Sequence, residues 1–155
     1  MAQQGVSADV HLERAARHRK VGEALRDAGD EWAAVCYFYS AYHLVKHALL
    51  IDPIFDDPTA LSRIHVTLTP DDRFTTSHHG RQRSGQPRDW GVNELVSRLY
   101  RPIAGNYERL HQASIHVRYE SGLNLPLDQM VAALEAVQAA HAAGELRATR
   151  APDPA

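Results

Sequence analysis

The stretch from Glu31 to about Ile51 constrains the fold more than any other part of this 155-residue chain. Aromatic residues such as Tyr37 and Phe38 share the stretch with alanines, so apolar or amphipathic side chains occur on nearly every side of a helix. A helix of that kind is buried by neighbours on several sides. Asp30 is a suitable N-cap, and Pro53 soon follows the expected end. The stretch therefore predicts the central helix of a bundle.

Four further helices are expected around this central one, because no segment shows the alternation of apolar and polar residues that is typical of a strand. They cover about Ser7–Ala28, Gly91–Arg101, Ala104–Glu120 and Pro126–Ala143. Gly29 suits the left-handed turn after the first of them, and Pro102 marks a break between the next two. The predicted fold class is all-α: an up-and-down antiparallel helical bundle of about five helices, forming one domain over residues 7–143. Residues 144–155 are expected to be a flexible tail.

A long insertion, residues 52–89, separates the second and third predicted helices. Within it, Asp57 and Pro58 form the pattern of an N-cap followed by proline at the first helical position, which predicts a short helix from about Pro58 to His65. Connections of this length are uncommon in compact domains and usually carry function or are disordered.

Composition excludes several classes of protein. Hydrophobic residues make up 44% of the chain and the net charge is -2, which argues against wholesale disorder and against a uniformly basic nucleic-acid binder. No apolar run reaches the ~18 residues that span a bilayer, and no signal-peptide pattern begins the chain, so we expect a cytoplasmic protein with no membrane contact. Cys36 is the single cysteine, which excludes an internal disulfide and a zinc site with several cysteines.

Two of the predicted helices carry residues that resemble a known superfamily. The motifs are the run from Tyr37 to His43, the pair Arg118–Tyr119 that ends the fourth helix, and Ser77–Gly80 in the insertion. In order and spacing they resemble the HEPN superfamily, the higher eukaryotes and prokaryotes nucleotide-binding domains, over residues 10–140. The resemblance implies a small bacterial helical protein that is usually a homodimer. Many members are metal-independent ribonucleases or toxin components, and others act only as binding partners.

The resemblance also singles out Arg109 and His116. The catalytic branch of the superfamily carries an Arg and a later His in one helix, and the six residues between Arg109 and His116 fit the outer limit of its spacing. Leu110 departs from the pattern, since a polar residue often follows that Arg. Seven positions are about two helical turns, so both side chains share a face. The implied roles are a general base for the RNA 2′-hydroxyl at His116 and phosphate binding at Arg109. The alternative is a pair of surface or dimer-interface residues.

The insertion contains a basic run from Arg73 to Arg88 with no acidic residue. Arginine, histidine and small residues together are typical of phosphate binding. The predicted RNA- or phosphate-binding residues are Arg73, His78, His79, Arg81, Arg83 and Arg88. The alternative is a solvated loop whose arginines pair with aspartates at positions 56, 57, 71 and 72.

His43 and His47 lie four residues apart and therefore on one helical face. Such a pair can bind zinc, nickel or copper if His111, His116 or Glu120 supplies a third ligand. The alternative is two histidines hydrogen-bonded within the bundle. No cofactor motif occurs in the sequence, and no cofactor is expected.

These observations lead to a main expectation and two alternatives. The main expectation is a HEPN-like protein that binds RNA or a nucleotide, as a metal-independent endoribonuclease or as a component of a toxin–antitoxin or defence system. The first alternative is a non-catalytic module that dimerises or binds a protein partner encoded nearby. The second is a metal-binding helical bundle.

Overall fold

The computed structural model describes residues 6–80, 84–85 and 89–150. Within these ranges the chain forms six α-helices and two short 3₁₀ helices, and no strand. The α-helices are α1 (Ala8–Asp27), α2 (Ala33–Ile51), α3 (Pro58–Ile64), α4 (Val92–Leu99), α5 (Arg101–Tyr119) and α6 (Leu127–Ala142). The 3₁₀ helices are η1 (Pro53–Asp56) and η2 (Pro70–Phe74). The all-α prediction is confirmed. The six α-helices of the described ranges correspond to the five expected bundle helices and to the short helix predicted in the insertion, which forms as α3.

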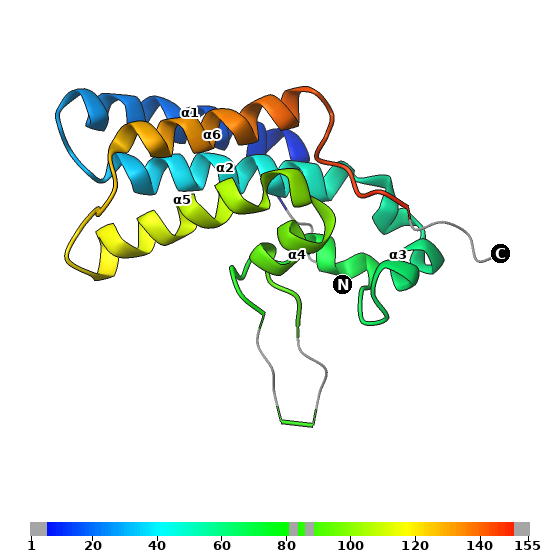
Figure 1. Cartoon of the computed structure of the whole chain (residues 1–155). Coiled ribbons are helices and arrows are strands. Elements are labelled where there is room, and N and C mark those ends of the chain that lie inside the picture. Colours follow the sequence, from blue (N-terminus) through cyan, green and yellow to red (C-terminus); the bar gives the residue numbers. More distant parts are fainter. Residues whose placement is uncertain (1–5, 81–83, 86–88, 151–155) are drawn as a thin grey trace.

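Helices α1, α2, α5 and α6 lie side by side with their axes roughly aligned (Figure 1). α2 contacts each of the other three, which is the central position that its composition predicts. Tyr37, Phe38, Val45 and Leu49 of α2 are fully buried. Phe38, Val45 and Leu49 share one face of α2, and Tyr37 lies about 100° around the helix from Phe38. Val35 and Ser40 are buried on further sides, so α2 contributes to the core in several directions. No helix in the described ranges is long and apolar enough to cross a membrane.

The helix ends follow local chemistry. Gly29 has a φ of 72°, and its N–H donates to the carbonyl of Arg26, so the left-handed glycine ends α1 as predicted. The break between α4 and α5 falls at Tyr100 rather than at Pro102. Pro102 is tolerated in the first turn of α5, where a backbone N–H has no helical partner to lose.

The connection between α2 and α4 is folded against the end of α2. Asp57 accepts a hydrogen bond from the N–H of Ala60 and caps α3, as its sequence predicts. Further along, the first residues of the basic run are held by α2: Lys46 donates to the carbonyl of Thr75, and the Tyr42 hydroxyl donates to that of Thr76 at 3.2 Å.

Residues 77–80 and residues 89–93 contact each other at the start of α4. The N–H groups of Val92 and Asn93 donate to the carbonyls of Ser77 and His78 at 2.8 and 2.9 Å. Gly80 has no room for a side chain, because a Cβ there would collide with the backbone of Asp89. Backbone hydrogen bonds and close packing therefore hold these two segments together at the start of α4.

The predicted flexible tail is corrected for residues 144–150. Leu146 is buried, and the N–H of Ala148 donates to the carboxylate of Asp52 at 2.8 Å. Arg150 forms an ion pair with Asp57 at 2.7 Å. The sequence does not reveal that Asp52 is a buried acceptor, and this contact fixes the segment after α6. The rest of the predicted tail, 151–155, lies outside the described residues.

Candidate functional site

Arg109 and His116 both lie on the outward side of α5. The residues of α5 that are buried in the bundle are Ile103, Tyr107, Leu110, His111, Ala113, Ser114 and Val117. Arg109 is exposed, and it makes no hydrogen bond or ion pair with any residue in the described ranges. The two residues are about 10 Å apart along the helix axis, from a rise of about 1.5 Å per residue.

The imidazole of His116 is held by a carboxylate. Its Nδ1 pairs with Oε2 of Glu120, one helical turn later, and the His116 side chain is 31% exposed. Because Glu120 occupies Nδ1, Nε2 is the ring nitrogen that remains for a substrate. A histidine oriented through one nitrogen by a carboxylate is the arrangement that general bases use in acyl and phosphoryl chemistry.

The other histidine of α5 has a different environment. His111 is 3% exposed, and its Nδ1 contacts the side-chain amide of Asn93 at 2.8 Å. Burial, together with the nearby His78, lowers the pKa of His111 to about 4. His111 therefore belongs to the core, and His116 is the histidine of α5 that a substrate can reach.

Arg73 is occupied by the protein. Its guanidinium donates to the carbonyls of Leu49, Leu50 and Asp52, and it forms an ion pair with Asp56 at 2.8 Å. These carbonyls belong to the last turn of α2, where backbone acceptors lack helical partners. Arg73 therefore caps α2 and is not available to a phosphate. Its ion pair with Asp56 agrees in part with the alternative in which the arginines of the insertion pair with nearby aspartates.

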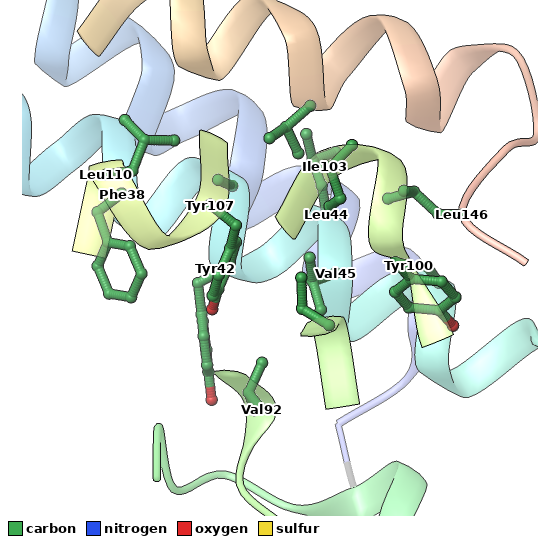
Figure 2. Packing of buried hydrophobic residues seen from close by; sticks show 14 of the residues in the cluster. Phe38, Tyr42, Leu44, Val45, Val92, Tyr100, Ile103, Tyr107, Leu110 and Leu146 are labelled. Atoms are coloured by element: carbon green, nitrogen blue, oxygen red, sulfur yellow. The ribbon is translucent and has the colours of Figure 1, made fainter. Parts of the chain in front are cut away.

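The other residues predicted to bind phosphate differ in their surroundings. His79 is exposed, whereas His78 packs between aromatic rings: its centroid lies 5.3 Å from Phe38 and from Tyr42. Burial lowers the pKa of His78, and its Nδ1 is buried with no hydrogen-bond partner among the described residues. Figure 2 shows Phe38, Tyr42 and Tyr107 in this part of the core. Arg81, Arg83 and Arg88 lie outside the described residues.

His43 and His47 do not act as a pair. His43 Nδ1 lies 2.9 Å from Nδ1 of His11 on α1, and His47 Nδ1 lies 2.9 Å from Nε2 of His141 on α6. Each histidine of α2 thus meets a histidine of a different helix. In the described ranges, no group of three or more His, Cys, Asp or Glu residues is arranged to hold a metal ion.

The contact between α1 and α2 contains a histidine stack that sequence reasoning missed. The ring of His43 stacks on those of His11 and His18, with centroids 5.2 and 5.3 Å away. Burial lowers the pKa of all three, to about 4 for His11 and His43. The sequence offers one clue, since His11 and His18 are seven residues apart and share a helical face. Nothing local indicates that His43 lies opposite them.

A cleft lined by arginines was also missed. Arg63 of α3, Arg98 of α4, Arg101 of α5 and Arg147 after α6 line a cavity of about 410 Å³. Arg98 and Arg101 are only three residues apart in the sequence. Arg63 and Arg147 reach the cleft only because distant segments of the chain pack together.

No protein-family model, no curated protein and no solved structure matches this chain. The resemblance to the HEPN superfamily therefore remains a prediction from the sequence.

Proposed function

We propose that this protein is an RNA-binding, metal-independent endoribonuclease of HEPN type, acting in a toxin–antitoxin or defence setting. The observation that carries the proposal is the pairing of His116 Nδ1 with Glu120 on the outward side of α5. Arg109, exposed on the same side of α5 and about 10 Å away along the helix axis, supplies a permanent positive charge.

The proposed reaction needs only these side chains and water. Nε2 of neutral His116 takes the proton of an RNA 2′-hydroxyl, and the 2′-oxygen attacks the adjacent phosphorus. The bond to the 5′-oxygen breaks, and that oxygen takes a proton from water, which gives a cyclic phosphate and a 5′-hydroxyl end. His116 then returns its proton to the hydroxide ion that is left. Glu120 stabilises the imidazolium that forms, and Arg109 stabilises the charge that builds on the phosphate.

The test is cleavage of a fluorescent single-stranded RNA in the presence of EDTA. Removing a general base costs about 10²- to 10⁴-fold in rate, so His116→Ala should lose nearly all activity. Arg109→Ala should lose activity as well. The matched control is Arg17→Ala, because Arg17 is also an exposed helical arginine but lies on α1.

Glu120 acts through His116, and its test separates positioning from folding. Glu120→Gln should lower kcat and leave KM close to the wild-type value, because the carboxylate does not touch the substrate. Circular dichroism checks that each variant is folded. Full activity in folded His116→Ala removes His116 from the mechanism and ends the proposal.

The second candidate function, a module that dimerises or binds a protein partner, is favoured by an apolar surface at one end of the bundle. Trp32, before α2, is 48% exposed, Tyr119, at the end of α5, is 75% exposed, and Leu125 in the α5–α6 turn is 39% exposed. The two turns are tied together, since Glu31 accepts a hydrogen bond from the N–H of Leu123 at 2.9 Å. Figure 1 shows both turns at the same end of the bundle.

Exposed apolar residues that cluster in this way are typical of interaction surfaces. Light scattering on the wild type and on Trp32→Glu tests this candidate. A dimer that the charged variant converts to a monomer supports self-association through this end, and a monomeric wild type contradicts it.

A further inference from the structure

The arginine cleft is built from segments that are far apart in the sequence. Arg63, Arg98, Arg101 and Arg147 line it, and its volume of about 410 Å³ lies within the usual range of ligand sites, about 300 to 1,000 Å³. All four arginines are exposed to solvent. The cleft is therefore open to a ligand from outside.

Among the described residues that line the cleft, arginines outnumber acidic residues. Glu145 is the one acidic residue among those that line it. Arg98, Arg101 and Arg147 make no hydrogen bond or ion pair with any residue in the described ranges. Like charges held close together repel one another, and a bound anion would remove that repulsion. The cleft also includes the first residues of α5, whose helix dipole adds positive potential there.

Hydrogen bonds at Asp52 hold the walls of the cleft in place. The carboxylate of Asp52 accepts from the hydroxyl of Tyr100, just before α5, and from the N–H of Ala148, in the segment after α6. Asp52 is 2% exposed, so solvent does not compete for these bonds. Figure 2 shows Tyr100 and Leu146 packed near each other at this point. The positions from which Arg101 and Arg147 extend are therefore fixed before any ligand binds.

An aromatic ring lies beside the arginines. A second cavity, of about 500 Å³, shares Arg98 and Arg101 with the cleft, and Trp90 and Glu94 also line it. The carboxylate of Glu94 accepts hydrogen bonds from the N–H groups of Gly80 and Gly91. The indole N–H of Trp90 donates to the hydroxyl of Thr67 at 2.9 Å, which fixes the ring. Guanidinium groups beside an aromatic ring are the combination that binds the phosphate and the base of a nucleotide.

The geometry points to the arginine cleft as a binding site for a phosphate group of an RNA strand, with a neighbouring base against Trp90. This inference rests on the proposed RNA-directed function. Arg101 precedes Arg109 by eight residues and His116 by fifteen, so the cleft lies about 12 Å and about 22 Å from them along α5. The phosphate in the cleft is therefore a different one from the phosphate at His116, and the cleft anchors the strand away from the bond that is cleaved.

The test measures binding separately from cleavage. The full chain is titrated by fluorescence anisotropy with a labelled single-stranded RNA whose 2′-oxygens are methylated, so that the proposed reaction cannot cleave it. Inorganic phosphate and AMP serve as competitors, at several salt concentrations. The variant is Arg98→Gln/Arg101→Gln, and the control is Arg17→Gln, which removes an exposed positive charge from α1. Both arginines of the double variant are exposed, and thermal melts check that it is folded.

The double variant should bind RNA about 100-fold more weakly, at about tenfold for each charged hydrogen bond that the substitutions remove. The slope of log affinity against log salt should fall by about 0.7 for each phosphate of the single strand that is no longer neutralised. Arg17→Gln should bind within about twofold of the wild type. Equal affinity of the double variant and the control overturns the inference.

The remaining outcomes separate this inference from the proposed function. If RNA binding depends on the cleft but His116→Ala does not change cleavage, the cleft is supported and the nuclease proposal fails. If His116 is needed for cleavage and the double variant binds RNA normally, the nuclease proposal stands and the cleft inference fails. If AMP binding is lost in the double variant while RNA binding is unchanged, the RNA-strand assignment is wrong and the site takes a free nucleotide.

Discussion

Acidification should destabilise the fold sharply, because three buried histidines resist protonation. Burial is the largest cause that lowers the pKa of His11, His43 and His111 to about 4, from about 6.5 in an unfolded chain. Positive neighbours add to the effect: Lys46 acts on His11, and His11 and His18 act on His43. Between pH 6.5 and pH 4 the unfolded chain binds these protons and the folded chain does not. Stability is therefore complete above pH 6.5 and falls as the pH falls through this window.

The magnitude follows from the two pKa values. For one histidine with those values, the free energy of unfolding falls by about 2 kcal/mol between pH 7 and pH 5. The three are 6%, 9% and 3% exposed, so solvent screens them little. Together they remove on the order of 5 kcal/mol, which is comparable with the whole stability of a small domain, about 5–15 kcal/mol. Burial also lowers the pKa of His18, His47, His78 and His141, which adds in the same direction.

The assay is urea denaturation at pH 7 and at pH 5, followed by far-ultraviolet circular dichroism. His111→Gln should reduce the difference between the two pH values by about 2 kcal/mol, because one resisting group is gone. Leu110→Ala is the matched control: Leu110 is fully buried next to His111, and its truncation should cost about 2–5 kcal/mol equally at both pH values. A wild-type difference below about 1 kcal/mol refutes the argument, as does a His111→Gln variant that keeps the full difference.

Three further predictions concern packing and reactivity. Gly22→Ala should lower the free energy of unfolding by about 1–2 kcal/mol in urea, because the new Cβ would lie 2.7 Å from a ring carbon of Tyr37; a more stable variant contradicts the close contact of α1 with α2. Asp52→Asn should cost about 1–3 kcal/mol and speed amide exchange at Ala148, and unchanged exchange there would show that another contact holds the C-terminal segment. Partial burial raises the pKa of Cys36, so the native thiol should react with a disulfide reagent more slowly than in urea, and equal rates would contradict this prediction.

Interactions within a few residues of one another could be predicted from the sequence. The all-round apolar pattern of α2 predicted its central place. The end of α1 at Gly29 and the cap of α3 at Asp57 were predicted because each depends on local backbone chemistry. The shared outward face of Arg109 and His116 followed from the helical repeat alone. The break before α5 was misplaced by two residues, because proline is tolerated in a first helical turn.

Contacts between side chains that are far apart in the sequence could not be predicted in this way. The pairing of His43 with His11 and of His47 with His141 depends on which helices lie beside α2. Arg73 was predicted to bind phosphate, but its guanidinium donates to backbone carbonyls at the end of α2.

The sequence by itself therefore determined the helical class, the central helix and the outward face that carries Arg109 and His116. Only the tertiary structure decided which charged residues gather at one surface and which, like Arg73, are occupied by the protein. The four arginines of the cleft come from α3, α4, α5 and the segment after α6, and their nearness depends on contacts such as that of Asp52 with Ala148. Side-chain periodicity reports which face of a helix is buried, whereas the packing of separate segments decides what each face meets.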